Sequence, residues 1–452
     1  MATLAAMLKR RGHDVRGSDQ NVYPPMSDFL AAEGIPIASG YSAEHIGHDV
    51  DLVVVGNAIS RGNPELESVL ERKIRYCSLP EAIRDHFLWS SRSIVVAGTH
   101  GKTTTTSLTG WLLTHGRLDP TVLVGGIALN FGDGGSSYRI GGGHDFVIEG
   151  DEYDSAFFDR SAKFLKYLPD AVIVNNIEFD HADIYADLDA VLLAFKRLVN
   201  LVPRNGLLLL GADSPHAAAL RSKAVSPVET FGTSDGADWL ATDIAHGNGV
   251  THFEVRHRGD VVGQFTSPLL GIHNVRNALA AIATGTWLGI SSADLAEGLG
   301  QFRGIKRRLE VVGSAGGVTI IDDFAHHPTA VRETLAALRT GYPDRRVWAV
   351  FEPRSASSCR RVFQDDFAAS FADADEVVIA AVFRSSLPES ERLSAEQLVE
   401  DLKGKGQRAR YVPAVDDIIG AIVDEHRSGD VVVVMSNGGF GGIHGKLLRA
   451  LT

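Results

Sequence analysis

A short loop that contains glycine and lysine is the strongest chemical signal in the sequence. Residues 98–104 read Gly-Thr-His-Gly-Lys-Thr-Thr and follow the apolar run at 94–97. Backbone N–H groups in such a loop, and at the start of the helix after it, can surround phosphate oxygens. Lys102 adds a positive charge for the terminal phosphates, and the Thr103 hydroxyl is a ligand for Mg²⁺. The generic motif has a glycine where Val96 stands, so this loop is a variant; a plain strand-to-helix turn is the alternative.

Carboxylates follow a second apolar run. The segment 146–154 reads Phe-Val-Ile-Glu-Gly-Asp-Glu-Tyr-Asp, so Glu149 ends the run and three further acidic residues follow it. Phosphoryl transfer needs a divalent metal to neutralise charge between phosphates, and Mg²⁺ prefers carboxylate and water ligands. Acidic loops are often only solvated, but a phosphate loop elsewhere in the chain favours a metal-binding role for Glu149.

The elements that must position these residues form three consecutive α/β units. Apolar runs that alternate with helical patterns predict parallel sheets, whose ligands lie at the carboxyl ends of the strands. We expect a Rossmann-like unit over 1–91, a central P-loop ATPase unit over 92–310 and a Rossmann-like unit over 311–452. The clearest predicted strands are listed by range: 51–55, 94–97, 146–149, 171–175, 207–210, 318–321, 347–351, 376–380 and 431–435.

The pattern Gly98-Thr-x-Gly-Lys-Thr resembles the ATP loop of the Mur ligases, which build the cell-wall peptide on a UDP-sugar. That family is similar in having three α/β domains, for the UDP substrate, for ATP and for the incoming amino acid or peptide. The resemblance implies ATP and Mg²⁺ as cofactors. It also implies a reaction in which the γ-phosphoryl group of ATP converts a carboxylate into an acyl phosphate, which an amine then attacks. In this chemistry the protein supplies mainly positioning and charge stabilisation.

Several further segments match the family. The stretch 175–183 resembles its Asn-Ile-x-x-Asp-His segment, which places His181 near a second metal; the alternative is a partly buried imidazole. Asn274 and Asn277 are three residues apart on a predicted helix, so their amides can face the adenine edge together, although Asn274 can also be a helix cap. The implied catalytic residues are Lys102, Glu149 and His181, and the implied metal ligands are Thr103, Glu149 and His181. The implied ATP contacts are Gly98, Thr99, His100, Gly101, Lys102, Thr103, Thr104, Asn274, Asn277, Arg308 and Asp323.

Three segments resemble one branch of the family, which joins UDP-N-acetylmuramate to the murein tripeptide L-alanyl-γ-D-glutamyl-meso-diaminopimelate. They are the loop 21–27, the run 149–159 with Tyr153, and the segment 351–355 with Arg354. The L-alanine-adding branch usually has serine at the position of Tyr153, and it is the main alternative. A guanidinium binds a carboxylate bidentately, which favours Arg354 as a contact of the peptide. The other implied substrate contacts are Asp19, Asn57, Asn130, His327 and Asn437.

Composition excludes other classes of protein. The 452 residues carry 44 basic and 56 acidic side chains, a formal charge of −12, which argues against a general nucleic-acid binder. The two cysteines form no metal or redox spacing, and the uncharged stretch 277–293 indicates a core helix rather than a membrane span. We expect a cytoplasmic enzyme, without membrane insertion, that is a monomer or a weak homo-oligomer. Lys196 is interpreted as a surface lysine.

The first unit departs from the family pattern. A mononucleotide-binding fold begins with a strand and a glycine-rich turn, whereas this sequence begins inside the following helix. We therefore expect that this strand and turn precede Met1 in the open reading frame. Two distant alternatives use the same signals: a P-loop switch that hydrolyses nucleotide against water, and a dinucleotide oxidoreductase. The second lacks the Gly-x-Gly-x-x-Gly turn that would hold a pyrophosphate.

Overall fold

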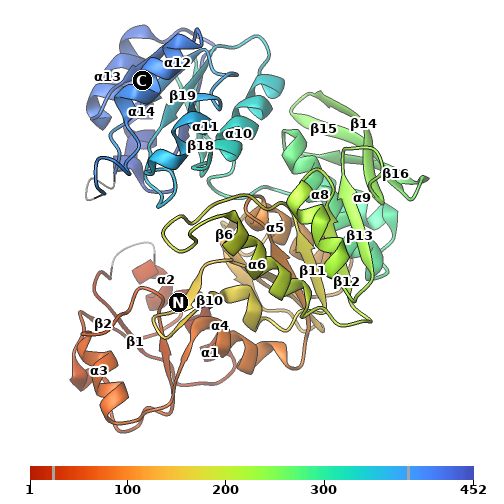
Figure 1. Ribbon diagram of the computed structural model, residues 1–452, viewed down its shortest axis with the longest axis vertical. Coiled ribbons are helices and arrows are strands. Elements are labelled where there is room, and N and C mark those ends of the chain that lie inside the picture. The colour runs from red at the N-terminus through yellow and green to blue at the C-terminus, as the bar shows by residue number, and fades with distance from the viewer. Residues whose placement is uncertain (23–25, 384–386) are drawn as a thin grey trace.

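The computed structural model describes residues 1–22, 26–383 and 387–452. Three units follow one another along the chain, and Figure 1 shows the C-terminal unit (blue) and the N-terminal unit (red to orange) at opposite ends of the central one. The three-unit α/β architecture expected from the sequence is confirmed. Tyr23, Pro24 and Pro25, in the loop used above for the branch comparison, lie outside the described residues. In the described part of the chain, no helix is long and apolar enough to cross a membrane.

The N-terminal unit contains two separate two-stranded parallel sheets, β1-β2 and β3-β4. Its elements are α1 (Ala2–Arg10), β1 (Gly17–Asp19), α2 (Met26–Ala32), β2 (Ile37–Ser39), β3 (Val53–Val55), α3 (Pro64–Glu71), β4 (Tyr76–Ser78) and α4 (Leu79–Ile83). A single parallel sheet was expected here. The two pairs stay apart because no strand among the described residues bridges β1 and β3.

The central unit contains a ten-stranded sheet in the order β16-β15-β14-β13-β12-β11-β5-β8-β6-β7. Its strands are β5 (Arg92–Ala97), β6 (Thr121–Ala128), β7 (Ser136–Arg139), β8 (Asp145–Glu149), β11 (Ala171–Val174), β12 (Leu207–Gly211), β13 (Val228–Gly232), β14 (Trp239–Gly247), β15 (Val250–His257) and β16 (Asp260–Ser267); β9 (Asp154–Ala156) and β10 (Asp159–Ala162) form a separate pair. Its helices are α5 (Lys102–His115), α6 (Leu188–Val199), α7 (Pro215–Ala218), α8 (Ile272–Trp287) and α9 (Ser292–Gly300).

Both faces of the central sheet are buried, which explains the continuous apolar runs of its parallel strands. Successive residues of β5 point to opposite faces, so that Ile94 joins one hydrophobic core and Val95 the other. The first core is closed by α5, α8 and α9. The second is closed by α6 together with α1 and α4 of the N-terminal unit. The N-terminal unit therefore packs directly on the central sheet.

The C-terminal unit contains a six-stranded sheet in the order β17-β18-β22-β19-β20-β21, parallel except for β17. Its elements are β17 (Glu310–Ala315), β18 (Val318–Asp323), α10 (Pro328–Gly341), β19 (Val347–Phe351), α11 (Gln364–Ala368), β20 (Glu376–Ile379), α12 (Ala395–Gly404), β21 (Ala409–Tyr411), α13 (Val415–Glu425), β22 (Val431–Met435) and α14 (Ile443–Ala450). Helices α10 to α12 cover one face, and α13 and α14 cover the other. The carboxyl ends of its parallel strands carry Asp323, Glu352 and Ser436.

Candidate functional site

The phosphate loop joins the buried strand β5 to α5 and requires glycine at two positions. Gly98 has φ +133°, and a Cβ there would lie 3.1 Å from the backbone N of Asn175. Gly101 has φ +79°, and a Cβ there would lie only 2.4 Å from Oδ1 of Asn277. Both conformations are costly for any residue with a side chain, so the two glycines allow the loop to close tightly against its neighbours. The helix begins at Lys102, as the sequence predicts.

A chain of buried hydrogen bonds connects the phosphate loop to the start of α8 and stabilises it. Asn274 Nδ2 donates to Leu270 O (2.8 Å), Asn277 Nδ2 donates to Asn274 Oδ1 (3.1 Å), and Thr105 Oγ1 donates to Asn277 Oδ1 (3.1 Å). Asn175 Nδ2 then connects Thr105 Oγ1 (3.0 Å) to His100 O (3.2 Å). The two amides predicted to face adenine are thus partnered within the protein. Asn274 is not the cap of α8, whose N-cap residue is Gly271.

Lys102 lies in a buried charge cluster with a glutamate and a histidine. Its Nζ is 2.8 Å from Oε2 of Glu152, and His181 Nε2 is 3.1 Å from Oε1 of the same carboxylate. Burial would lower the pKa of Lys102, but the charges of Glu152 and Asp151 outweigh burial and raise the pKa. The lysine is therefore charged at neutral pH and lies at the start of the helix, where phosphate oxygens would meet it.

Thr103 and Glu149 face each other, as two ligands of one metal must. The Thr103 hydroxyl donates to Glu149 Oε1 (2.9 Å), and the Gly125 N–H donates to Oε2 (2.6 Å). A Cβ on Gly125 would lie 2.9 Å from that carboxylate, so glycine at this position makes room for it. Burial, and then the charge of Asp151, raises the pKa of Glu149. A buried carboxylate whose hydrogen-bond donors among the described residues are a hydroxyl and a backbone N–H fits a cation site.

The segment that connects the central unit to the C-terminal unit contacts Thr103 of the phosphate loop. Arg308 Nη2 donates to Thr103 Oγ1 (3.3 Å), and its guanidinium lies over the Phe324 ring. Asp323, at the end of β18, accepts hydrogen bonds from the N–H groups of Leu309 (2.7 Å) and Ala325 (2.8 Å). Arg308 is therefore close to the predicted phosphates and metal. Asp323 is placed to fix the backbone that carries Arg308, in addition to any contact with nucleotide.

The segment after β11 contacts the C-terminal unit directly. Phe179 stacks on Phe363 with ring centroids 5.8 Å apart, and Ser357 Oγ donates to Asp180 Oδ1 (2.5 Å). His327 caps α10 and lies 3.1 Å from Phe179 O through Nε2. Burial, followed by the charge of His100, lowers the pKa of His327 to about 4. The C-terminal unit is thus closed over the phosphate loop.

Arg354 and Asn437 form a second polar group at the carboxyl ends of β19 and β22. The Arg354 guanidinium lies 3.6 Å from the centre of the Phe383 ring, and its ion pair with Glu352 is long, at 3.5 Å. The side chain packs across Gly438, where a Cβ would lie 2.1 Å from Arg354 Nε. Asn437 Oδ1 is buried and has no hydrogen-bond partner in the part of the chain that the structure describes. These two residues offer both donors and an acceptor to a ligand.

Three other predicted residues are not brought into this group. Asn130, which follows β6, holds the segment between α9 and β17 through two hydrogen bonds. Its Oδ1 accepts from Arg303 N (2.8 Å), and its Nδ2 donates to Gln301 O (3.1 Å). Both ends of this amide are occupied by backbone groups, and its assignment as a substrate contact stays a prediction. Asp19 and Asn57 are exposed, at the ends of β1 and β3, and their assignment stays a prediction. Lys196 is exposed on α6, as interpreted from the sequence.

Sequence reasoning missed three residues of the site. Glu152 is the carboxylate that holds both Lys102 and His181, although the sequence singled out Glu149. Arg307 donates to Ser436 O (2.6 Å) and Gly438 O (2.7 Å), so it holds the glycine-rich loop after β22. Glu178 contacts His100, with Nε2 and Oε2 2.9 Å apart. Their positions within the matched segments were the available signal, since each adjoins or lies between residues that were named.

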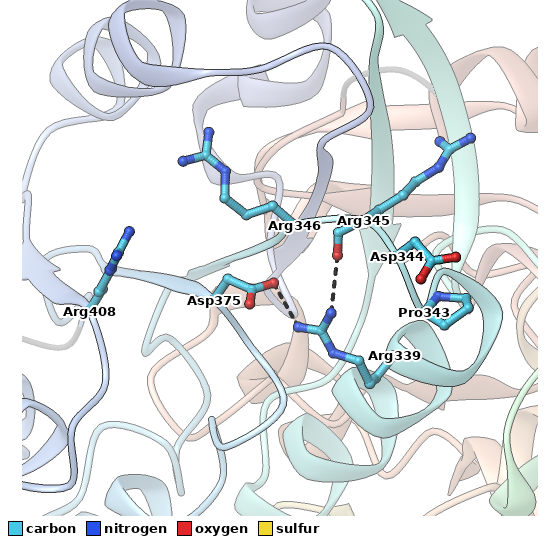
Figure 2. Close-up of a pocket in the computed structure, with 7 residues that line it drawn as sticks. All are labelled: Arg339, Pro343, Asp344, Arg345, Arg346, Asp375 and Arg408. Carbon is cyan, nitrogen blue, oxygen red and sulfur yellow. Dashed lines mark hydrogen bonds and ion pairs between the residues drawn. The ribbon is translucent and has the colours of Figure 1, made fainter.

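A hollow of about 470 Å³ in the C-terminal unit lies elsewhere. Figure 2 shows its lining, in which Arg339 donates to Asp375 and to the backbone oxygen of Arg345. Its lining residues are Arg339, Pro343, Asp344, Arg345, Arg346, Asp375 and Arg408. Most of them precede β19, β20 and β21, so the hollow is at the amino ends of the parallel strands. Ligands of such sheets bind at the carboxyl ends, where the residues described above lie.

Three family descriptions match successive parts of the chain: "Mur ligase family, catalytic domain" at residues 1–88, "Mur ligase middle domain" at 96–285 and "Mur ligase, glutamate ligase domain" at 307–438. A Haemophilus influenzae protein named UDP-N-acetylmuramate–L-alanyl-gamma-D-glutamyl-meso-2,6-diaminoheptandioate ligase is 41% identical over 453 residues, covering 100% of this chain and 96% of that protein. The chain belongs to the Mur ligase family. The family assignment made from the phosphate loop is confirmed.

Two further comparisons bear on the branch of this Mur ligase. The crystal structure of a murein peptide ligase from Psychrobacter arcticus is 36% identical, with a TM-score of 0.73, and covers 100% of this chain and 96% of that one. A Salinibacter ruber UDP-N-acetylmuramate–L-alanine ligase is 39% identical over 444 residues, covering 97% of this chain and 90% of that protein. Overall sequence identity therefore distinguishes the tripeptide-adding branch from the L-alanine-adding branch only weakly. Particular residues must be compared to choose between them.

Replacing Asn277 with alanine tests the bracing of the loop. The change leaves the Thr105 O–H without its acceptor and Asn274 Oδ1 without its donor, and an unsatisfied buried polar group costs about 1–3 kcal/mol. We expect kcat to fall about tenfold, with the preference for ATP over GTP unchanged, in steady-state assays with both nucleotides. Asn200→Ala is the control, because Asn200 Nδ2 donates to Lys196 O at the exposed C-terminal end of α6. A lost preference for ATP over GTP, with normal kcat, would instead indicate that Asn277 contacts the adenine base.

Proposed function

We propose that this Mur ligase forms an amide bond between the carboxylate of UDP-N-acetylmuramate and the amine of L-alanyl-γ-D-glutamyl-meso-diaminopimelate, with ATP and Mg²⁺, in the recycling of cell-wall peptide. A carboxylate is a poor electrophile, because the loss of oxide from it is prohibitive near neutral pH. Transfer of the γ-phosphoryl group gives an acyl phosphate and ADP. Attack of the amine on the acyl carbon then expels phosphate and leaves the amide.

The residues around the phosphate loop support this chemistry by position and charge. Lys102 is held at the helix start by Glu152 (2.8 Å) and is charged, so it can neutralise a phosphoryl group in transfer. Arg308 approaches from the C-terminal side and adds a second cation at Thr103. No nucleophilic side chain is needed, since both bond-forming steps join substrate to substrate. The arrangement serves to align reactants and stabilise charge.

The same group contains a set of ligands that fits Mg²⁺. Thr103 and Glu149 would hold the ion, since a hydroxyl and a carboxylate are the oxygen ligands that Mg²⁺ prefers. His181 contacts the same Glu152 carboxylate as Lys102, and its role at a second metal stays a prediction. When bound, Mg²⁺ supplies charge neutralisation between the β- and γ-phosphates. The glycine at 125, which leaves space for Glu149, supports this assignment.

The observation that carries the choice of acceptor is the full-length similarity to the tripeptide-ligating relative. Two local features support it. Tyr153, where the L-alanine branch usually has serine, lies 5.2 Å from the His181 ring and under Lys163 Nζ at 3.9 Å. Arg354 supplies donors for the carboxylates of the peptide, and Asn437 Oδ1, which has no hydrogen-bond partner among the described residues, supplies an acceptor for its N–H groups.

A direct comparison of two acceptors tests the proposal. The enzyme is supplied with ATP, Mg²⁺ and UDP-N-acetylmuramate, and with either the tripeptide or L-alanine, and the product is identified by mass spectrometry. We expect kcat/KM for the tripeptide to exceed that for L-alanine at least tenfold, because binding of the remote glutamyl and diaminopimelyl groups helps to orient the amine. An equal or higher value with L-alanine assigns the chain to the other branch. ATP hydrolysis without any amide product contradicts the ligase assignment.

A further inference from the structure

Three side chains from different segments meet beside the phosphate loop, apart from Thr103 and Glu149. They are His100 of the loop, Glu178 of the segment after β11, and His327 at the N-cap of α10. His100 Nε2 is 2.9 Å from Glu178 Oε2, and His327 Nδ1 is 3.5 Å from the same oxygen. The three ligand atoms all lie within 4.8 Å of one another. This group joins the central unit to the C-terminal unit.

The orientation of His327 is that of a metal ligand. Its Nε2 lies 3.1 Å from Phe179 O, which only accepts, so Nε2 carries the proton. Nδ1 therefore carries a lone pair, which accepts the Thr329 N–H (3.3 Å) as the cap of α10 and which a metal ion would take over. The Nδ1 lone pair and Glu178 Oε2 are two acceptors 3.5 Å apart, and a cation between them would be held by both. Histidines that bind metals usually donate the other ring N–H to a carbonyl or carboxylate, as here.

The backbone holds His100 in the same arrangement. Its N–H donates to Asn176 Oδ1 (2.8 Å), and its O accepts from Asn175 Nδ2 (3.2 Å). The imidazole is turned toward Glu178 and lies 4.6 Å from the His327 ring, centre to centre. The backbone N–H of His100 is thus already used within the protein, so a contact of His100 with ATP must come from elsewhere in the residue.

We propose that His100, Glu178 and His327 bind a divalent transition-metal ion of the Zn²⁺ type, which ties the phosphate loop to the C-terminal unit. Two imidazole nitrogens and one carboxylate oxygen suit such an ion better than Mg²⁺. Ligands about 2.0–2.1 Å from a tetrahedral Zn²⁺ lie roughly 3.4 Å apart, close to the separation of Nδ1 and Oε2. Glu178 is 36% exposed, so solvent can take the remaining position. The site exists only while the two units are closed, and metal binding therefore stabilises closure.

Cobalt is a spectroscopic probe for this site. The metal-free chain is titrated with Co²⁺ in excess Mg²⁺, which occupies oxygen ligands, and visible absorption reports the geometry. We expect one Co²⁺ per chain with nitrogen ligation, and affinity at least about tenfold lower in His327→Ala and in the isosteric Glu178→Gln. His257→Ala is the matched control, since His257 lies 3.3 Å from Glu229 but belongs to no three-ligand group among the described residues.

Two outcomes overturn the site. One is a wild-type chain without a ligand-field spectrum at any Co²⁺ concentration that leaves it folded. The other is Glu178→Gln protein that binds Co²⁺ as tightly as wild type. Zn²⁺ must also raise the unfolding temperature of the wild type more than that of Glu178→Gln, a measurement independent of activity. Glu149→Gln must keep the Co²⁺ spectrum, because Glu149 belongs to the predicted Mg²⁺ site; its loss would place the cobalt there instead.

Discussion

Lys102→Ala is expected to lower the rate of amide formation about thousandfold, because a positioned charge that stabilises phosphoryl transfer contributes several kcal/mol. The lysine is nearly buried, with 11% of its side chain exposed, and carries its charge at neutral pH. It also donates to Gly98 O (2.7 Å), so it is fixed at the mouth of the loop. The measurement is the initial rate of product formation at saturating ATP and UDP-N-acetylmuramate.

This substitution has a structural consequence that must be separated from its catalytic one. Without Lys102, the buried carboxylate of Glu152 keeps His181 as a neighbour, at 3.1 Å. Removing one partner of a buried pair costs up to about 3–5 kcal/mol of stability when nothing replaces it. The thermal unfolding of the variant is therefore measured together with its activity. Lys166→Ala is the control, since Lys166 pairs with Asp159 (2.7 Å) away from the loop. A folded Lys102→Ala protein with near-normal activity would contradict the assignment.

The parallel strands were predictable because both of their faces are buried. The expected strands at 347–351 and 431–435 coincide with β19 and β22, and the run at 94–97 lies within β5. A four- or five-residue apolar run in an α/β protein has few alternatives to a buried strand. The carboxyl ends of these strands carry the residues that sequence reasoning selected, because parallel strands place their ends at one edge of the sheet.

The antiparallel part of the central sheet was missed. Strands β14, β15 and β16 have one partly exposed face, so their sequences alternate between apolar and polar residues. The turns Asn248-Gly249 and Arg258-Gly259 were the available signal, since both residues of each pair have positive φ. Long-range hydrogen bonds could not be foreseen at all. Neither the bracing of Asn277 against Thr105 nor the use of Asn130 by Arg303 follows from local sequence, because the partners are 172 and 173 residues apart.

The contact between His100 and His327 is another feature that local sequence does not predict. Each histidine is conspicuous within its own motif, but their contact depends on how the C-terminal unit closes on the central one. That closure rests on tertiary contacts such as Phe179 against Phe363 and Ser357 with Asp180. Sequence patterns identify such residues one at a time. Only the arrangement of the units shows which of them act together.

Arg354→Ala is expected to reduce kcat/KM for the tripeptide about hundredfold, mainly through KM. The guanidinium is partly exposed and its ion pair with Glu352 is long, so several N–H donors are available to a carboxylate of the acceptor. Charge-assisted hydrogen bonds contribute about 1.5–3 kcal/mol each, and tenfold corresponds to about 1.4 kcal/mol. The KM for ATP should stay unchanged, because the nucleotide meets the other end of the site. Arg360→Ala is the control, since Arg360 pairs with Glu391 at similar exposure.

A modified acceptor separates binding of the carboxylate from general damage to the loop. Arg354 packs across Gly438, so its removal also loosens the backbone beside Asn437. A tripeptide with the diaminopimelate carboxylates converted to amides lacks the group that the guanidinium binds. If Arg354 acts through that group, the wild type should lose about as much kcat/KM with the amide as Arg354→Ala loses with the natural tripeptide. The variant itself should hardly distinguish the two acceptors. Equal discrimination by the wild type and the variant would show that another residue binds the carboxylate.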